Sequence, residues 1–266
     1  MRTVVITGAT RGIGAALARS LAAPEVRLVL AGRDLDAGER VAADARREGS
    51  EARVVAADLS SVAGARSLAE ALRGESLDAL VHNAGVWPSR RELDAQGLER
   101  AFVVNHLAPA ALTEALLRGP TPPGRVVVVT AGLIALARWS PERTPSGDDF
   151  HALRTYANTK LWFALYARSI AARVPVLAVH PGVIRTGLGD RGGIVGALLR
   201  AVKRRWKTPE HAARTLAPHC LRDLAAGETD RFFHEQLSAP WPAPADDAVA
   251  RAEVGPRTEA LLARGS

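Results

Sequence analysis

Short apolar runs alternate along the chain with longer segments of helical period. Apolar residues fill six runs almost completely, at 3–7, 26–32, 52–57, 78–82, 125–130 and 175–180, and a shorter run lies near 231–233. Strands that are apolar on both faces are typical of a parallel sheet covered by helices on both sides. Helix-length segments lie between these runs, at 13–23, 35–48, 61–73, 94–118 and 151–173. The pattern predicts an α/β Rossmann-type fold, with a doubly wound, mostly parallel sheet of about seven strands.

Two long connections and the tail interrupt this alternation, but nothing marks a domain boundary, so we expect residues 1–266 to form a single domain. Residues 132–150 and 187–207 both follow predicted strands, at the edge where open α/β sheets bind ligands. Long loops in compact domains are commonly functional lids, and we interpret 187–207 as a substrate flap. Residues from about 240 to 266 are predicted to be a C-terminal extension that ends in a helix.

The composition indicates a soluble, cytoplasmic protein. The 35 Lys and Arg residues exceed the 28 Asp and Glu residues, giving a formal net charge of +7. Because basic and acidic residues are interleaved, we interpret the charge as solvated surface and expect no nucleic-acid partner. The basic run at 200–207 leaves open a face toward an anion or a membrane. We expect no stable membrane insertion, no secretory leader, no disulfide from the single Cys220 and no metal site.

A glycine-rich turn follows the first predicted strand and opens the first predicted helix. It reads TGATRGIG over residues 7–14. Glycines there let the backbone approach a pyrophosphate, and the helix N-terminus offers free N–H groups to the phosphates. The turn therefore predicts a dinucleotide site that includes Gly8, Thr10, Arg11, Gly12, Ile13 and Gly14.

The form T-G-x-x-x-G-x-G resembles the glycine motif of the short-chain dehydrogenase/reductase family. The family's later motifs follow in order over about residues 1–190: Asn83-Ala84-Gly85, Asn105, Tyr156 with Lys160, Pro181-Gly182 and Thr186. Within the family, the chain resembles the retinol dehydrogenase-like and WW-domain oxidoreductase-like branch in AGRDLDAGER, AFVVNHLAPAALT, HPGVIRT and SAPWPAP. The resemblance implies further cofactor contacts at Asp58, Leu59, Asn83, Ala84, Gly85, Tyr156, Lys160, Pro181, Gly182, Val183 and Thr186.

The end of the second predicted strand indicates which cofactor is bound. An acidic side chain there would bind the ribose 2′-hydroxyl, but this chain has Arg33, and Arg11 lies in the glycine turn. Two guanidinium groups suit the 2′-phosphate, although Asp34 follows immediately. We therefore predict NADP(H) in preference to NAD(H).

Tyr156 and Lys160 are the candidate proton-transfer pair. They lie four residues apart on a predicted helix and so share a face. A neighbouring ammonium favours the phenolate, so we expect a lowered pKa for Tyr156. The resemblance implies that Lys160 also holds the nicotinamide ribose and that Asn105 steadies a water in a proton relay.

The family's third catalytic group, a serine that hydrogen-bonds the reacting oxygen, is missing. In the branch resembled, it lies about 25 residues before the tyrosine, where this chain has Ala131. Thr130 is adjacent, but consecutive strand residues point to opposite faces, so it could substitute only if the strand has already bent. Losing one oxyanion donor costs about 10²–10³ in rate.

The predicted substrate pocket is apolar and contains Trp87, Ala131, Trp139 and Val183, with Trp206 on the flap. We interpret His82, His106 and His180 as structural. The leading prediction is an NADP(H)-dependent oxidoreductase that interconverts a carbonyl and an alcohol on a small substrate. A non-redox cyclase, lyase or isomerase, or a cofactor-binding protein, stays open because of Ala131. The resemblance also implies a homo-oligomer formed through the helices at 94–118 and 151–173.

Overall fold

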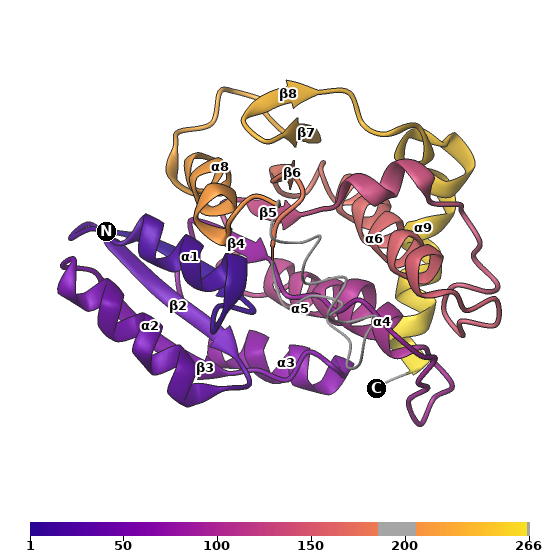
Figure 1. Cartoon of the computed structure of the whole chain (residues 1–266), viewed down its shortest axis with the longest axis horizontal. Helices are drawn as coiled ribbons and strands as arrows, with labels where there is room; N and C mark the ends of the chain where they lie inside the picture. The colour runs from indigo at the N-terminus through magenta and orange to yellow at the C-terminus, as the bar shows by residue number, and fades with distance from the viewer. Residues whose placement is uncertain (186–205, 265–266) are drawn as a thin grey trace.

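The computed structural model describes residues 1–185 and 206–264 (Figure 1). Its strands are β1 Arg2–Thr7, β2 Val26–Gly32, β3 Glu51–Ala56, β4 Ala79–His82, β5 Val126–Val129, β6 Val176–His180, β7 Arg231–His234 and β8 Leu237–Ala239. Its helices are α1 Gly12–Leu21, α2 Leu35–Arg47, α3 Val62–Ala71, α4 Arg100–Phe102, α5 Ala108–Leu117, α6 Ala152–Ser169, α8 Pro209–Leu221 and α9 Ala248–Arg264. Shorter turns are the π-helical η1 Val103–Leu107 and the 3₁₀ turns η2 Gly132–Leu136 and η3 Ala243–Asp246.

The described strands form one sheet in the order β3-β2-β1-β4-β5-β6-β7-β8. All pairs are parallel except β7 with β8, which confirms the Rossmann-type, mostly parallel architecture. The eighth strand escaped prediction because β8 is a short antiparallel edge whose residues are exposed or half-buried, so it has no apolar run. The strand order reverses between β1 and β4, and a ligand crevice forms at the carboxyl ends of such neighbours.

Two apolar layers hold the helices against the sheet. In β5, Val126 and Val128 belong to the layer under α3, α5, α6 and α9, whereas Val127 and Val129 belong to the layer under α1, α2 and α8. Alternate residues of a strand point to opposite faces, so an uninterrupted valine run fills both layers. This explains why the predicted strands read as continuous apolar runs.

The prediction of a single helix over 94–118 is wrong in two respects. The helix begins only at Arg100, because Asp94 accepts hydrogen bonds from Gln96 N and Leu98 N and so closes a turn instead. The backbone then widens into the π-helical turn η1 before α5. Pro109 has no N–H for the carbonyl of Asn105, which removes one helical hydrogen bond at this place.

The C-terminal extension crosses the end of the sheet and finishes in α9, as the sequence predicted. In Figure 1, α9 lies alongside α6, and its Thr258 hydroxyl is 3.1 Å from His106 Nε2 on η1. Trp139, after η2, is 3.3 Å from Glu253 Oε2 on α9 through its indole Nε1. The last helix therefore packs on the helices that carry Asn105 and Tyr156. No described helix is long and apolar enough to cross a membrane.

Candidate active site

The glycine turn is joined to the end of β4 by the hydroxyl of Thr7. This oxygen accepts hydrogen bonds from Asn83 N and Ala84 N, both at 3.1 Å, and donates to the Val81 carbonyl. Asn83 Nδ2 in turn donates to the carbonyls of Thr7 and Gly8 at 2.9 and 3.1 Å. The turns after β1 and β4 are thus brought together where the strand order reverses.

The need for glycine in this turn is clearest at Gly8 and Gly14. Gly8 has a φ of +66°, a conformation that residues with a β-carbon rarely adopt. A β-carbon on Gly14 would lie 2.3 Å from the Gly8 carbonyl oxygen and 2.6 Å from Asn83 Nδ2. The backbone is therefore packed too closely at Gly14 for any side chain.

The N-terminus of α1 has the features of a phosphate site. Asp34 caps α2 and Ser61 caps α3 by accepting backbone N–H bonds, whereas the first residue before α1, Arg11, provides no side-chain cap. The free N–H groups at the start of a helix bind anions together with the helix dipole. The residues present at this turn therefore fit a dinucleotide pyrophosphate.

The predicted adenosine contacts lie at the ends of β2 and β3. Arg11 and Arg33 are exposed, and neither side chain makes a hydrogen bond to the described residues. The Asp34 carboxylate accepts a hydrogen bond from Ala37 N at 2.9 Å, so it is engaged in capping its own helix. Gly32 and Ala56 are partners at the ends of β2 and β3, so Arg33 and Asp58 follow from the same edge of the sheet. The Ser60 backbone N–H, and the guanidinium of Arg33 to a smaller extent, lower the pKa of Asp58.

Asn105 is buried and connects the β4 turn to α6. Its Oδ1 accepts from Val86 N at 2.8 Å, and its Nδ2 donates to the Val86 carbonyl at 2.9 Å and to the Thr159 hydroxyl at 3.0 Å. Gly85 lies close to this side chain, and a β-carbon there would be 3.2 Å from Asn105 Oδ1. The side-chain amide of Asn105 is therefore occupied in holding the β4 turn against α6, so a water of the proton relay would have to bind the backbone of Asn105.

Tyr156 is buried on α6 and stacks on Trp87 from the β4 turn. The ring centroids are 4.8 Å apart and the planes differ by 10°. Burial raises the pKa of Tyr156 above its ordinary value. The expectation of a lowered pKa is therefore wrong for this arrangement, because desolvation of the phenolate dominates.

Lys160 lies one turn further along α6 and points toward β5. Its Nζ donates to the Val129 carbonyl at 2.7 Å, and burial lowers the pKa of Lys160 to about 8. This carbonyl takes one ammonium proton and leaves two for other acceptors. Lys160 is thus placed at the carboxyl end of β5, two residues before Ala131, and Tyr156 lies one helical turn before Lys160 on α6.

Thr130 does not replace that serine in this structure. Ala131 is extended, with φ −139° and ψ 142°, and η2 begins only at Gly132. Neighbouring residues of an extended strand point to opposite faces. Thr130 is accordingly buried, and its hydroxyl has no hydrogen-bond partner among the described residues. The strand bends too late for Thr130 to occupy the position of Ala131.

The turn after β6 lies beside the β7–β8 connection. Gly182 has a φ of +90°, and a β-carbon there would lie 2.9 Å from Glu235 Oε1. Val183 is 55% exposed, and its carbonyl accepts from Lys207 N at 3.1 Å. Thr186 and the predicted flap up to residue 205 lie outside the described residues.

Trp139, which the sequence also assigns to the pocket, packs elsewhere. Its indole lies on Trp162, with centroids 4.4 Å apart, rather than against Tyr156. The Trp87 ring is the indole that the structure places on the tyrosine.

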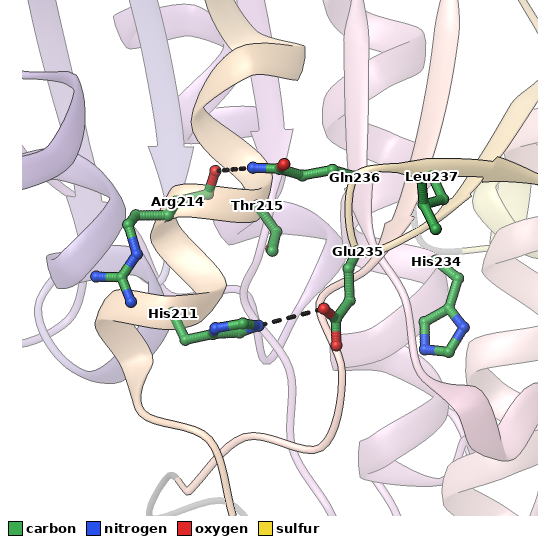
Figure 2. Close-up of a pocket in the computed structure, with 7 residues that line it drawn as sticks. All are labelled: His211, Arg214, Thr215, His234, Glu235, Gln236 and Leu237. Carbon is green, nitrogen blue, oxygen red and sulfur yellow. Dashed lines mark hydrogen bonds and ion pairs between the residues drawn. The ribbon is translucent and has the colours of Figure 1, made fainter.

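A cavity of about 550 Å³ lies beside the turn after β6, between α8 and the β7–β8 turn. Figure 2 shows the Glu235 side chain between His211 and His234, with its carboxylate directed toward His211. Glu235 is also paired with Lys207 and adjoins Gly182, so the cavity wall continues into the turn after β6. None of its lining residues was predicted, because they come from segments without a recognisable motif.

Comparison with known proteins identifies the family. The family model described as short chain dehydrogenase matches residues 2–141. Dehydrogenase/reductase SDR family member 13 from Homo sapiens is 35% identical over 268 residues, covering 94% of this chain and 70% of the relative. Retinol dehydrogenase 14 from Mus musculus is 31% identical, covering 94% of this chain and 83% of the relative. The chain therefore belongs to the short-chain dehydrogenase/reductase family, whose members are oxidoreductases that use NAD(P).

Solved structures share the fold. An uncharacterised protein from Mycobacterium paratuberculosis has a TM-score of 0.77 at 27% identity, with 98% of this chain and 93% of that chain covered. A blue fluorescent protein from a metagenomic library, solved in complex with NADPH, has a TM-score of 0.67 at 24% identity, with 88% and 95% covered.

Sequence reasoning missed two positioning residues. Thr7 and Thr159 each place a hydroxyl between segments that are far apart in the chain. Thr7 lies inside the glycine motif, which is a usable signal. Thr159 is adjacent to Lys160 but shows no pattern of its own, because its partner Asn105 is 54 residues away.

Proposed function

We propose that this protein reduces a carbonyl group on a small apolar substrate with NADPH, and that it catalyses the reverse oxidation when the alcohol is in excess. The proposal depends mainly on one observation: Tyr156 and Lys160 lie one turn apart on α6, and the Lys160 Nζ reaches the Val129 carbonyl at the end of β5, two residues before Ala131. Bound NADPH would supply a hydride to the carbonyl carbon while the oxygen takes a proton from the Tyr156 hydroxyl, giving an alcohol and NADP⁺.

The raised pKa of Tyr156 suits the direction of reduction. A buried phenol keeps its proton over the physiological range and can give it to an alkoxide, which is far more basic. Below a pH of about 8 the Lys160 Nζ is charged, and two of its protons remain available for a ribose hydroxyl. Oxidation of an alcohol would need the phenolate, which burial disfavours until an added ligand changes the surroundings.

The preference for NADPH is supported by Arg11 and Arg33. Both guanidinium groups are exposed near the ends of strands that lead to the cofactor edge, and the adjacent Asp34 carboxylate caps α2. Guanidinium groups bind a 2′-phosphate through charge-assisted hydrogen bonds. The NADPH bound to the blue fluorescent protein of similar fold agrees with this assignment.

The apolar substrate is supported by large exposed side chains on the segments that follow β5 and β6, and by Trp87. Val183, after β6, is 55% exposed, and Leu136, on η2 after β5, is 70% exposed. Trp87 adds a flat aromatic wall on Tyr156. Exposed apolar side chains gathered at a ligand edge are typical of a site for a nonpolar molecule.

The test is loss of NADPH in the presence of a panel of apolar aldehydes and ketones, with NADPH binding measured by calorimetry. We expect turnover by the unaltered protein, and none by Tyr156→Phe, which should bind NADPH with nearly unchanged affinity. Tight NADPH binding without turnover in both proteins would instead support a non-redox or cofactor-binding role.

A further inference from the structure

The tight turn between β7 and β8 contains a glutamate where glycine is usual. His234 pairs with Leu237, so Glu235 and Gln236 are the two central residues of a hairpin turn. Glu235 has a φ of +59°, in the left-handed region, at the first central position. Glycine and asparagine are favoured there because a longer side chain makes this backbone conformation strained. Backbone strain of this kind is concentrated at functional sites, which directs attention to the Glu235 side chain.

The carboxylate and the backbone of Glu235 both contact the turn after β6. Glu235 N donates to the carbonyl of His180, the last residue of β6, at 2.7 Å. A β-carbon on Gly182 would lie 2.9 Å from Glu235 Oε1. The carboxylate is paired with the Lys207 ammonium, which lowers the pKa of Glu235 and keeps it charged at neutral pH. In Figure 2 its other side faces His211 on α8, at 3.4 Å from Nε2.

Lys207 links this carboxylate to the backbone that follows Gly182. Lys207 N donates to the Val183 carbonyl at 3.1 Å, and Arg185 N donates to the Lys207 carbonyl at 2.8 Å. The Lys207 Cδ lies 3.4 Å from the position of a β-carbon on Gly182. Lys207 is thus bound to the residues after Gly182 through its backbone and to Glu235 through its side chain.

The turn at 181–183 borders the end of β5, to which Lys160 is bound. A β-carbon on Gly132, just after β5, would lie 2.9 Å from His180 Nε2, so the segments that end β5 and β6 are in contact. The Lys160 Nζ donates to the Val129 carbonyl at the end of β5. Ligands of open α/β sheets bind at this carboxyl edge.

We propose that Glu235 is a positioning residue for NADPH, which acts through Lys207 to hold the turn at 181–183 in the shape that binds the cofactor. This inference rests on the NADPH binding proposed above. A turn that is already ordered binds better because less conformational entropy is lost on binding. The side chains of Lys207 and Glu235 are 45% and 29% exposed, and ion pairs of such exposure contribute little to folding. Loss of Glu235 should therefore weaken cofactor binding without weakening the fold.

The variant Glu235→Gly separates these two effects. Glycine removes the carboxylate but suits the left-handed backbone, so Tm should stay the same or rise. We expect the Kd for NADPH, measured by calorimetry, and the KM for NADPH to rise about 3–10-fold. The kcat at saturating NADPH should change less than about 2-fold, because a loss of uniform binding leaves kcat unchanged.

Glu51→Gln is the matched control. It breaks an ion pair with Arg27 at the start of β2 and β3, on the edge of the sheet opposite the carboxyl ends. Its Kd for NADPH should equal that of the unaltered protein.

A double-mutant cycle tests whether the effect of Glu235 passes through Lys207. Lys207→Met keeps most of the aliphatic stem, removes the ammonium, and should by itself weaken NADPH binding about as much as Glu235→Gly does. The combined variant should bind no more weakly than the weaker single variant, because the two residues form one link. Multiplied losses in the combined variant would mean that the residues act separately, and would overturn the inference.

The remaining outcomes distinguish this inference from the proposed reaction. An unchanged Kd in Glu235→Gly, or a weaker Kd that comes with a clearly lower Tm, removes the positioning role and leaves carbonyl reduction intact. The expected Kd changes without carbonyl turnover in any protein would support the positioning role and remove the reaction. Absence of NADPH binding to the unaltered protein would remove both.

Discussion

The indole of Trp87 lies parallel to the phenol of Tyr156, with ring centroids 4.8 Å apart. The two residues belong to different elements, the turn after β4 and the helix α6, and Asn105 joins these elements by bonding to Val86 and Thr159. The stack therefore depends on the hydrogen bonds of Asn105, which hold the two elements together. It gives Tyr156 a fixed ring plane and buries it at the same time.

Replacing Trp87 should separate these two effects. Trp87→Ala removes the stack, worth about 0.5–1.5 kcal/mol, and lets water reach the phenol. We expect a kcat about 2–10-fold lower and a lower pKa for Tyr156, seen as an acidic shift of the alkaline limb of the alcohol-oxidation rate profile. Trp87→Phe keeps an aromatic face and should retain most of kcat. An unchanged pH profile in Trp87→Ala would show that Trp87 does not control the burial of Tyr156.

Arg33 is expected to discriminate between the two nicotinamide cofactors. A charge-assisted hydrogen bond contributes about 1.5–3 kcal/mol, so Arg33→Ala should weaken NADPH binding by about 10–100-fold. NADH lacks the 2′-phosphate, and its Kd should change less than about 2-fold. Calorimetry with both cofactors measures this. Arg40→Ala, on the exposed surface of α2, is the matched control. Equal losses for NADPH and NADH would contradict the phosphate contact.

Buried His82 should make the protein sensitive to acid. Its Nε2 is 2.8 Å from the Thr113 hydroxyl, and burial, aided by the nearby Lys160 charge, lowers the pKa of His82 to about 3. In the unfolded chain the His82 imidazole takes up a proton with a pKa of about 6.5, whereas in the folded chain it stays neutral down to about pH 3. The free energy of unfolding therefore decreases as pH falls from about 6.5 toward about 3.

The variant His82→Asn should remove this contribution. Between pH 7 and pH 5 the unaltered protein should lose about 2 kcal/mol more free energy of unfolding than His82→Asn does. Urea denaturation at the two pH values measures the difference. His151→Asn, at an exposed position before α6, should behave like the unaltered protein. Parallel acid losses in all three proteins would show that His82 accepts a proton in the folded state.

Those features that depend on local pattern were predictable from the sequence, whereas those that depend on long-range packing were not. The valine run of β5 and the turn from Gly8 to Gly14 can be recognised in the sequence because adjacent residues form them. The raised pKa of Tyr156 arises from burial, and its stacking partner Trp87 is 69 residues away by number, so no spacing rule reveals this environment. In the same way, β8 forms by antiparallel hydrogen bonding to β7, and its own three residues show no strand pattern.

The expected association state departs from what the family resemblance implies. Every residue of α6 from Thr155 to Ala167 is buried within the chain itself, and α5 is buried at all but two of its positions. On one side, α9 covers α6 and η1, with His106 bound to Thr258. A stable interface needs an exposed apolar face, and these two helices do not offer one.

We therefore expect the full chain to sediment as a monomer of 28.1 kDa at micromolar concentration. Sedimentation velocity over a range of concentrations measures this. Thr258→Asp and Leu261→Asp should loosen α9, because each places a charge in a buried position, and should expose α6 for self-association. The exposed Glu259→Asp is the control on the same helix. A stable dimer of the unaltered protein would mean that another surface, or a displaced α9, forms the family contact.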